Sequence, residues 1–214
     1  MITLHEKPWL KKNETLICFG DSLTAPKDGY VALLAKQLKP KGVRVINAGR
    51  GGDKTPWALT RLYSDVIDRK PHAVSIFLGT NDAVIGRGRW ADEPRVTPEA
   101  YRCNLVWIVH LCRLSGIKKF SITPPLWHYE GDLWTEYGDA FGPYRFAARE
   151  AADEAGARFV PADVAFEQEW QKHPGHSGLL LTRDGGHLNA RGYEFLATAM
   201  LKAWKMNPSP CSAL

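Results

Sequence analysis

The sequence predicts a single-domain α/β protein, a three-layer α/β/α sandwich built on a five-stranded parallel sheet. Short apolar runs bounded by turn residues alternate with segments of helical periodicity. The runs are apolar on both faces, as in a parallel sheet that helices cover on both sides. The 214 residues suffice for one core without a disulfide or metal, so we expect one domain over residues 1–214.

Five short runs are the expected strands. They cover residues 15–20, 42–47, 73–79, 118–123 and 157–161. Because strands and helices alternate, the strands should be parallel. Ligands of such sheets bind beyond the carboxyl ends of the strands, so residues directly after the strands are the first candidates for a site.

Helical patterns fill the gaps between these strands. Tyr30, Leu34 and Leu38 share one face of the first helix. The third gap contains Thr97, a favourable N-cap, and Pro98 in the first turn. The apolar stripe that follows is Tyr101, Leu105, Ile108 and Cys112. A last helix is expected to begin near Asn189, with a stripe at Tyr193, Leu196, Met200 and Trp204.

Two longer connections, residues 83–96 and 124–140, should leave strand ends on one edge of the sheet, where a loop can form a pocket wall. Both are rich in aromatic and basic side chains, which either bind a sugar or are buried against a helix or subunit; burial is the favoured interpretation. The residues concerned are Arg87, Arg89, Trp90, Trp127, His128, Tyr129, Trp134, Tyr137, Phe141 and Tyr144.

Composition excludes several classes of protein. Hydrophobic residues make up 44% and charged residues 24%, the balance of a globular protein. The net charge is +5, but the 28 basic residues form no block, so a nucleic-acid partner is not expected. No run approaches a membrane span, and the first residues lack the apolar core of a signal peptide. We therefore expect a cytoplasmic protein, unless a leader has been removed.

The four cysteines show neither metal-ligand spacing nor a disulfide framework. We expect free thiols, with Cys18 in a strand and Cys112 on the core face of a helix. No cofactor and no metal are expected. Residues 49–52 do not continue into a dinucleotide-binding G-x-G-x-x-G motif, because Lys54 stands where the third glycine is needed.

Three residues could together perform nucleophilic catalysis. Ser22 follows the first expected strand, and His187 lies three residues after Asp184. A serine hydroxyl needs an imidazole to take its proton and a carboxylate to orient that imidazole. The ordinary alternatives are a helix-capping or turn serine, with Asp21 capping the same turn, and a surface histidine.

Four segments carry a more specific signal. They are residues 20–24 (GDSLT), 47–53 (NAGRGGD), 79–82 (GTND) and 184–187 (DGGH). In this order they resemble the four sequence blocks of the SGNH (GDSL) hydrolase superfamily, whose fold is flavodoxin-like. The larger α/β-hydrolases differ, because their serine lies in G-x-S-x-G and their acid lies far from the histidine.

The resemblance also implies an oxyanion hole formed by the backbone N–H groups of Ser22 and Gly52 and the side-chain amide of Asn81. Ester cleavage passes through a tetrahedral oxyanion, and losing one donor to it typically costs about 3 kcal/mol. Glycine allows a backbone N–H to point into a site without a side chain in the way. The alternatives are an ordinary glycine-rich turn at Gly52 and an Asx-turn at Asn81.

The resemblance implies a serine esterase that removes a small acyl group, acetyl above all, from an alcohol for which a carbohydrate is one candidate. The sequence is similar to those of intracellular acetylesterases of the superfamily. A lysophospholipase or thioesterase of the same fold stays open. A metal-dependent phosphoesterase, with His173, His176, Asp184 and His187 as ligands, is the rival from another class. The expected partner is a small-molecule or oligosaccharide ester, and homo-oligomer formation is left open.

Overall fold

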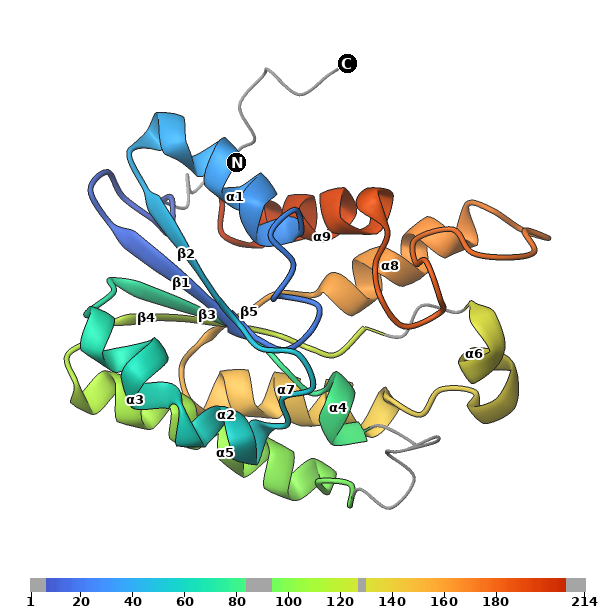
Figure 1. The fold of residues 1–214 in the computed structure, drawn as a ribbon, viewed down its shortest axis with the longest axis horizontal. Helices are drawn as coiled ribbons and strands as arrows, with labels where there is room; N and C mark the ends of the chain where they lie inside the picture. The colour runs from blue at the N-terminus through green and yellow to red at the C-terminus, as the bar shows by residue number, and fades with distance from the viewer. Residues whose placement is uncertain (1–6, 84–93, 127–129, 207–214) are drawn as a thin grey trace, which may run out of the picture.

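The computed structural model describes residues 7–83, 94–126 and 130–206, and its centre is a five-stranded parallel sheet (Figure 1). The spatial order of the strands is β2-β1-β3-β4-β5. Their bounds are β1 Thr15–Gly20, β2 Arg44–Gly49, β3 Ala73–Phe77, β4 Lys119–Thr123 and β5 Arg158–Phe159. The predicted fold class, a parallel α/β sheet between helical layers, is confirmed.

Helices cover both faces of the sheet (Figure 1). One face carries α1 (Tyr30–Leu38), α8 (Ala162–Gln171) and α9 (Ala190–Ala203). The other carries α2 (Thr55–Thr60), α3 (Leu62–Asp65), α5 (Pro98–Leu114) and α7 (Gly142–Glu154). Two further helices, α4 (Thr80–Ala83) and α6 (Gly131–Tyr137), follow β3 and β4, and short 3₁₀ turns cover Lys39–Lys41 and Ile67–Arg69. None of the described helices has both the length and the apolar character to cross a membrane.

The side chains of β1 show how one strand supports two cores. Ile17 and Phe19 point into the core under α2, α3, α5 and α7, while Leu16 and Cys18 point into the core under α1, α8 and α9. Successive side chains of a strand face opposite sides of the sheet, so a strand covered on both sides must be apolar throughout. All four of these side chains are fully buried.

The predicted helix starts are confirmed at two caps. The Thr97 hydroxyl accepts a hydrogen bond from the Ala100 N–H at 3.2 Å and caps α5. The Asn189 side chain accepts one from the Gly192 N–H at 2.9 Å and caps α9. The predicted stripes of α1, α5 and α9 are buried, Cys112 among them.

Four expected strands differ in their bounds: β3 ends at Phe77 instead of 79, β4 begins at Lys119 instead of 118, and the two edge strands differ more. β2 runs over Arg44–Gly49 instead of 42–47, and β5 has only two residues, Arg158–Phe159, instead of the expected 157–161. The expectation that all strands are buried on both faces is wrong for this pair, whose residues are mostly half-buried or exposed. An edge strand has one neighbour and lies where the covering helices end.

The strand order places the topological switch point of the sheet between β1 and β3. After β1 the chain passes outward to β2 and then crosses back over β1 to form β3. Connections on either side of such a switch point diverge beyond the carboxyl ends of the strands, which is where open α/β sheets bind ligands. Gly20 pairs in register with both Gly49 and Phe77, so these three strands end level at that edge.

Candidate active site

The carboxyl ends of β1, β2 and β3 deliver Ser22, Gly52 and Asn81 to one edge of the sheet. Ser22 comes two residues after β1, Gly52 three after β2, and Asn81 four after β3 within α4. A Cβ added to the neighbouring Gly51 would lie 4.0 Å from the Ser22 Cβ, so the loop after β2 lies directly beside the serine. The prediction that these segments meet at one edge is confirmed.

Ser22 contacts a histidine from the other end of the chain. Its Oγ lies 3.3 Å from Nε2 of His187. Of the ordinary alternatives, the helix-capping serine is wrong, because α1 begins only at Tyr30 and has Gly29 as its N-cap, whereas Ser22 does lie in a turn. Asp21 caps the turn, as anticipated: its Oδ1 accepts a hydrogen bond from the Leu23 N–H at 2.9 Å.

Asp184 holds the imidazole through its other nitrogen. Oδ2 of Asp184 lies 2.9 Å from Nδ1 of His187. A carboxylate only accepts hydrogen bonds, so in the neutral imidazole Nδ1 carries the proton and Nε2 is left as the acceptor facing the serine hydroxyl. The His187 side chain is 40% exposed and that of Asp184 49%, so solvent and substrate can reach the pair.

The Asp184 carboxylate also organises its own loop. Its Oδ1 accepts hydrogen bonds from the backbone N–H groups of Gly186 at 2.9 Å and His187 at 2.6 Å. Partial burial raises the pKa of Asp184, but these bonds and the imidazole outweigh it, and the pKa lies below its ordinary value. The group therefore stays ionised under acidic conditions in which an ordinary aspartate becomes protonated.

A buried carboxylate that the sequence did not reveal braces this loop. Glu130, which is 4% exposed, accepts hydrogen bonds from the backbone N–H groups of Leu180 and, at 3.1 Å, Leu181. A Cβ on Gly131 would lie 2.9 Å from the Gly185 Cα, so the two segments are in close contact. Glu130 precedes α6 in a connection without periodicity, and its partners are about 50 residues away, so no local pattern indicates its role.

The candidate hole donors are also in place. The side-chain amide of Asn81 donates to the Asp53 carbonyl at 3.0 Å, a contact with a residue 28 positions away. Gly52 adopts φ +81°, a conformation that favours glycine, and a Cβ there would meet nothing within 4 Å. Within the described part of the chain, the backbone N–H groups of Ser22 and Gly52 donate to no protein acceptor.

Two acidic side chains beneath the site are buried and have unusual pKa values. Burial raises the pKa of Asp21 to about 7, the Leu23 N–H opposes this, and the nearby Asp82 and Asp53 carboxylates reinforce it. Burial raises the pKa of Asp82 to about 6, although the backbone N–H and hydroxyl of Thr55 both donate to it. Asp21 Oδ2 has no hydrogen-bond partner among the described residues.

We expect Asp21→Asn to flatten the pH dependence of stability. The unfolded carboxyl ionises near 3.8 and the folded one near 7, so from about pH 4 to about 7 only the folded state keeps the proton. The free energy of unfolding of the wild type therefore falls as the pH rises through this window. Melting temperatures measured between about pH 5 and about pH 8.5 should decline less in the variant. Asp28→Asn, at an exposed position, should behave as the wild type; an equal decline in Asp21→Asn would contradict the assignment.

The four residues of the metal-site rival are not brought together. His187 contacts Ser22 and Asp184, whereas His173 contacts Glu169 and packs near His176, with ring centroids 6.4 Å apart. In the described ranges, no group of three or more His, Cys, Asp or Glu side chains is placed to hold a metal ion.

The two aromatic connections are only partly described. Phe141 and Tyr144 are buried, and Trp134 is partly buried against the same core, so for these three the packing interpretation holds. The Tyr144 hydroxyl donates to the Val96 carbonyl at 2.7 Å. The other predicted wall residues, Arg87, Arg89, Trp90, Trp127, His128 and Tyr129, lie outside the described residues, as do Cys211 and the side chain of Tyr137.

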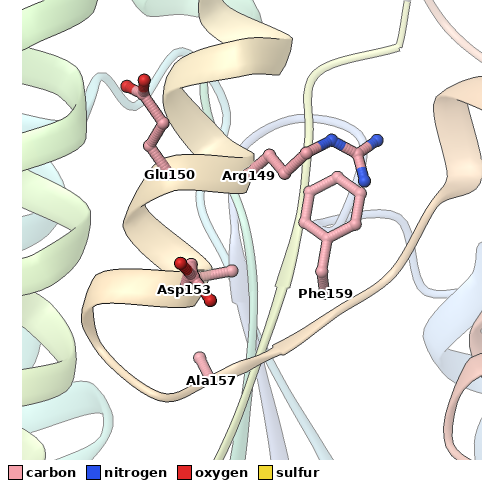
Figure 2. Close-up of a pocket in the computed structure, with 6 residues that line it drawn as sticks. Arg149, Glu150, Asp153, Ala157 and Phe159 are labelled. Carbon is pink, nitrogen blue, oxygen red and sulfur yellow. The ribbon is translucent and has the colours of Figure 1, made fainter.

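A separate hollow of about 460 Å³ lies where α7 ends and β5 begins (Figure 2). The Arg149 guanidinium lies over the Phe159 ring, 4.1 Å from its centroid, and acidic side chains of α7 stand nearby. The lining residues are Arg149, Glu150, Ala152, Asp153, Ala157 and Phe159. Because β5 starts here, this hollow lies at the amino ends of the strands, opposite to Ser22, and is not part of the candidate active site.

Known proteins resemble this chain in sequence. Acetylxylan esterase of Geobacillus stearothermophilus is 26% identical over 215 residues, which cover 88% of this chain and 93% of that protein. Esterase TesA of Pseudomonas aeruginosa is 34% identical over 49% of this chain and 51% of its own length. The uncharacterized lipoprotein YqeF of Bacillus subtilis is 34% identical over 51% of this chain and 48% of its own. The chain thus spans about half the length of the latter two relatives.

Solved structures show the same fold. LAE5, an alpha/beta hydrolase enzyme from the metagenome of Lake Arreo, superposes with a TM-score of 0.83 at 23% identity, covering 95% of this chain and all of that one. The acetylxylan esterase Axe2 of Geobacillus stearothermophilus superposes with a TM-score of 0.78 at 25% identity, covering 92% and 96%. The family model of the GDSL-like lipase/acylhydrolases matches residues 18–195. Sequence blocks, fold and family model agree, and the chain belongs to the GDSL-like lipase/acylhydrolase family, a family of carboxylic ester hydrolases.

Proposed function

We propose that this protein is a serine esterase in which Ser22 is the nucleophile, His187 the general base and acid, and Asp184 the residue that orients the imidazole. The observation that carries the proposal is the hydrogen-bonded series of the three side chains. The two distances, 3.3 Å from Ser22 Oγ to His187 Nε2 and 2.9 Å from Nδ1 to Asp184, suit proton transfer from the hydroxyl to the ring.

The reaction has two halves. Ser22 Oγ attacks the ester carbonyl carbon while His187 Nε2 takes the hydroxyl proton, and a tetrahedral oxyanion forms. The oxyanion collapses, the bond to the leaving alcohol breaks, and His187 gives its proton to the alcohol oxygen. Water then attacks the acyl-Ser22 carbonyl, loses a proton to His187, and releases the carboxylic acid as Ser22 Oγ recovers that proton.

In this proposal the oxyanion is bound by the backbone N–H groups of Ser22 and Gly52 and by the Asn81 amide. The two N–H groups have no protein acceptor among the described residues, which leaves them available to a substrate oxygen. The amide has two N–H bonds, and among the described residues its one acceptor is the Asp53 carbonyl. Donors that are aimed before the charge develops cost no reorganisation during the reaction.

We propose an acetyl group as the preferred acyl group and an acetylated carbohydrate as the preferred substrate. The support is the acetylxylan esterase of Geobacillus stearothermophilus, which matches along 88% of this chain, together with the exposure of the His187 and Asp184 side chains. An open site admits the bulk of an oligosaccharide while only the acetyl group meets Ser22.

A panel of esters tests this proposal. The purified protein should give its highest kcat/KM on p-nitrophenyl acetate among p-nitrophenyl esters of increasing chain length. It should also release acetate from acetylated xylo-oligosaccharides. A maximum on long acyl chains, lysophosphatidylcholine or acyl-coenzyme A thioesters, with no acetate release, would contradict the acetyl and carbohydrate parts. Activity on bis(p-nitrophenyl) phosphate that requires added zinc would favour the metal rival.

A further inference from the structure

Arg61 is a buried cation beneath the candidate active site, at the junction of α2 and α3. Its side chain is only 6% exposed, although arginine is rarely buried unless its charge and donors are matched. None of the catalytic roles proposed above uses it. The acceptors that surround it indicate why a charge is placed there.

The Arg61 guanidinium donates to four groups at once. Nε donates to Asp53 Oδ2 at 2.5 Å, Nη2 to the Gly20 carbonyl at 2.9 Å, and Nη1 to both the Ala48 carbonyl and Asp65 Oδ2 at 2.8 Å. The guanidinium carbon also lies 4.3 Å from the centroid of the Phe19 ring. A planar guanidinium with five N–H bonds can satisfy this set, whereas the ammonium group of lysine has three donors at one point.

Three of these acceptors, Gly20, Ala48 and Asp53, lie on the segments that carry the Ser22 and Gly52 donors of the proposed oxyanion hole. Gly20 is the last residue of β1, two residues before Ser22. Its carbonyl also accepts the Arg50 N–H at 3.0 Å and so ties the end of β1 to the loop that carries Gly52.

The Asp53 acceptor completes the link. Asp53 follows Gly52 directly in the sequence, and its carbonyl accepts the Asn81 side-chain amide at 3.0 Å. Arg61 therefore stands at the common support of the Ser22 turn, the Gly52 loop and the Asn81 amide. Among the described residues, Asp65, which is 31% exposed, is the carboxylate partner of Arg61 that lies outside this support.

The geometry points to Arg61 as the positioning residue of the oxyanion hole, an inference that rests on the esterase function proposed above. Arg61 touches no substrate. It fixes the ends of β1 and β2 and, through Asp53, the Asn81 amide, so that the three donors converge on one oxygen. Oxyanion binding depends on donors held within a few tenths of an ångström, so a small relaxation of this support should lower the rate of the chemical step.

The test compares Arg61→Lys with Asp65→Asn on p-nitrophenyl acetate. Arg61→Lys keeps the charge but cannot reach all of the acceptors, so kcat should fall about 10- to 100-fold with KM within about threefold of the wild type. Asp65→Asn, the matched control, weakens only the bond that leads away from the hole and should leave kcat within about twofold. Melting curves and near-ultraviolet circular dichroism show whether each variant is folded.

A double-mutant cycle with Asn81→Ala separates positioning from general structural damage. Asn81→Ala alone should lower kcat about 100- to 1,000-fold. If Arg61 acts through the hole, Arg61→Lys should lower kcat at least about threefold less in the Asn81→Ala background than in the wild type. Equal losses in both backgrounds, or an effect on KM alone, would overturn the inference.

The remaining outcomes of these measurements also distinguish the two proposals. If Arg61→Lys does not fold, Asp53→Asn takes its place, because it weakens the same contact with an isosteric side chain; the same kcat loss and the same coupling are expected. If Asn81→Ala retains full kcat, the proposed oxyanion hole is wrong, and the role of Arg61 is overturned with it. If Asn81→Ala loses kcat but shows no coupling to Arg61, the esterase proposal stands and the positioning role alone is overturned.

Discussion

Replacing Ser22 with alanine is expected to lower kcat/KM on p-nitrophenyl acetate by about four to six orders of magnitude. The hydroxyl oxygen is the atom that forms the acyl-enzyme. A water molecule in its place would not be held in the same position relative to the carbonyl carbon. The side chain is small and half-buried and, among the described residues, hydrogen-bonds to His187 alone, so the melting temperature should change little. Initial rates and thermal unfolding of the same preparation measure both effects.

Covalent labelling provides an independent check of the nucleophile. A fluorophosphonate should modify the wild type at Ser22 and leave Ser22→Ala unmodified, as peptide mass spectrometry can show. Ser115→Ala is the matched control, because Ser115 is an exposed serine at the end of α5 that donates only to the Leu111 carbonyl. Its labelling and its rate should equal those of the wild type. An adduct on another serine would refute the assignment of Ser22.

Replacing His187 with alanine should be nearly as damaging as the loss of Ser22, because the hydroxyl then has no base within reach. Asp184→Asn should also lose most activity while the protein stays folded. An amide donating to Nδ1 would favour the tautomer with the proton on Nε2, which cannot accept from the serine. Steady-state rates and melting curves test both variants, and His110→Ala, at an exposed position on α5, is the control.

The combination of variants gives the sharper result. Residues that act as one unit are strongly non-additive, so Ser22→Ala with His187→Ala together should be little worse than either alone. Multiplying losses would show that the two side chains act independently. The wild-type rate should also be unaffected by EDTA; a rate abolished by EDTA and restored by zinc would favour the metal-dependent rival.

The parts of this fold that local sequence predicts are those with a short-range cause. The Thr97 and Asn189 side chains each accept a hydrogen bond from the backbone N–H three residues later and so cap the helix that they begin. The run of apolar residues in β1 by itself indicates a strand that is buried on both faces. Asp184 and His187 are likewise a local pair, three residues apart. In each case a residue and its partner lie within one turn or loop.

The parts that sequence did not predict depend on distant partners. Position in the sheet decides how much of β2 and β5 is exposed, and this depends on strand order, which no single run encodes. From the sequence alone, Glu130 and Arg61 would be taken for solvent-exposed charges. In the folded protein Glu130 accepts hydrogen bonds from the Leu180 and Leu181 N–H groups, and Arg61 donates to the Gly20 and Ala48 carbonyls. A buried charge with long-range acceptors has no periodic signature.

The order of the site residues along the chain has a consequence for biosynthesis. A nascent chain that has just passed β5 already contains Ser22, Gly52, Asn81 and the five described strands, but it lacks His187, the proposed base. Asp184 and His187 follow together in one loop directly ahead of α9, where they contact each other in the folded protein. The contact between Ser22 and His187 can therefore form only after the segment directly ahead of α9 has been synthesised. Under the proposed function, activity would then be acquired late in synthesis.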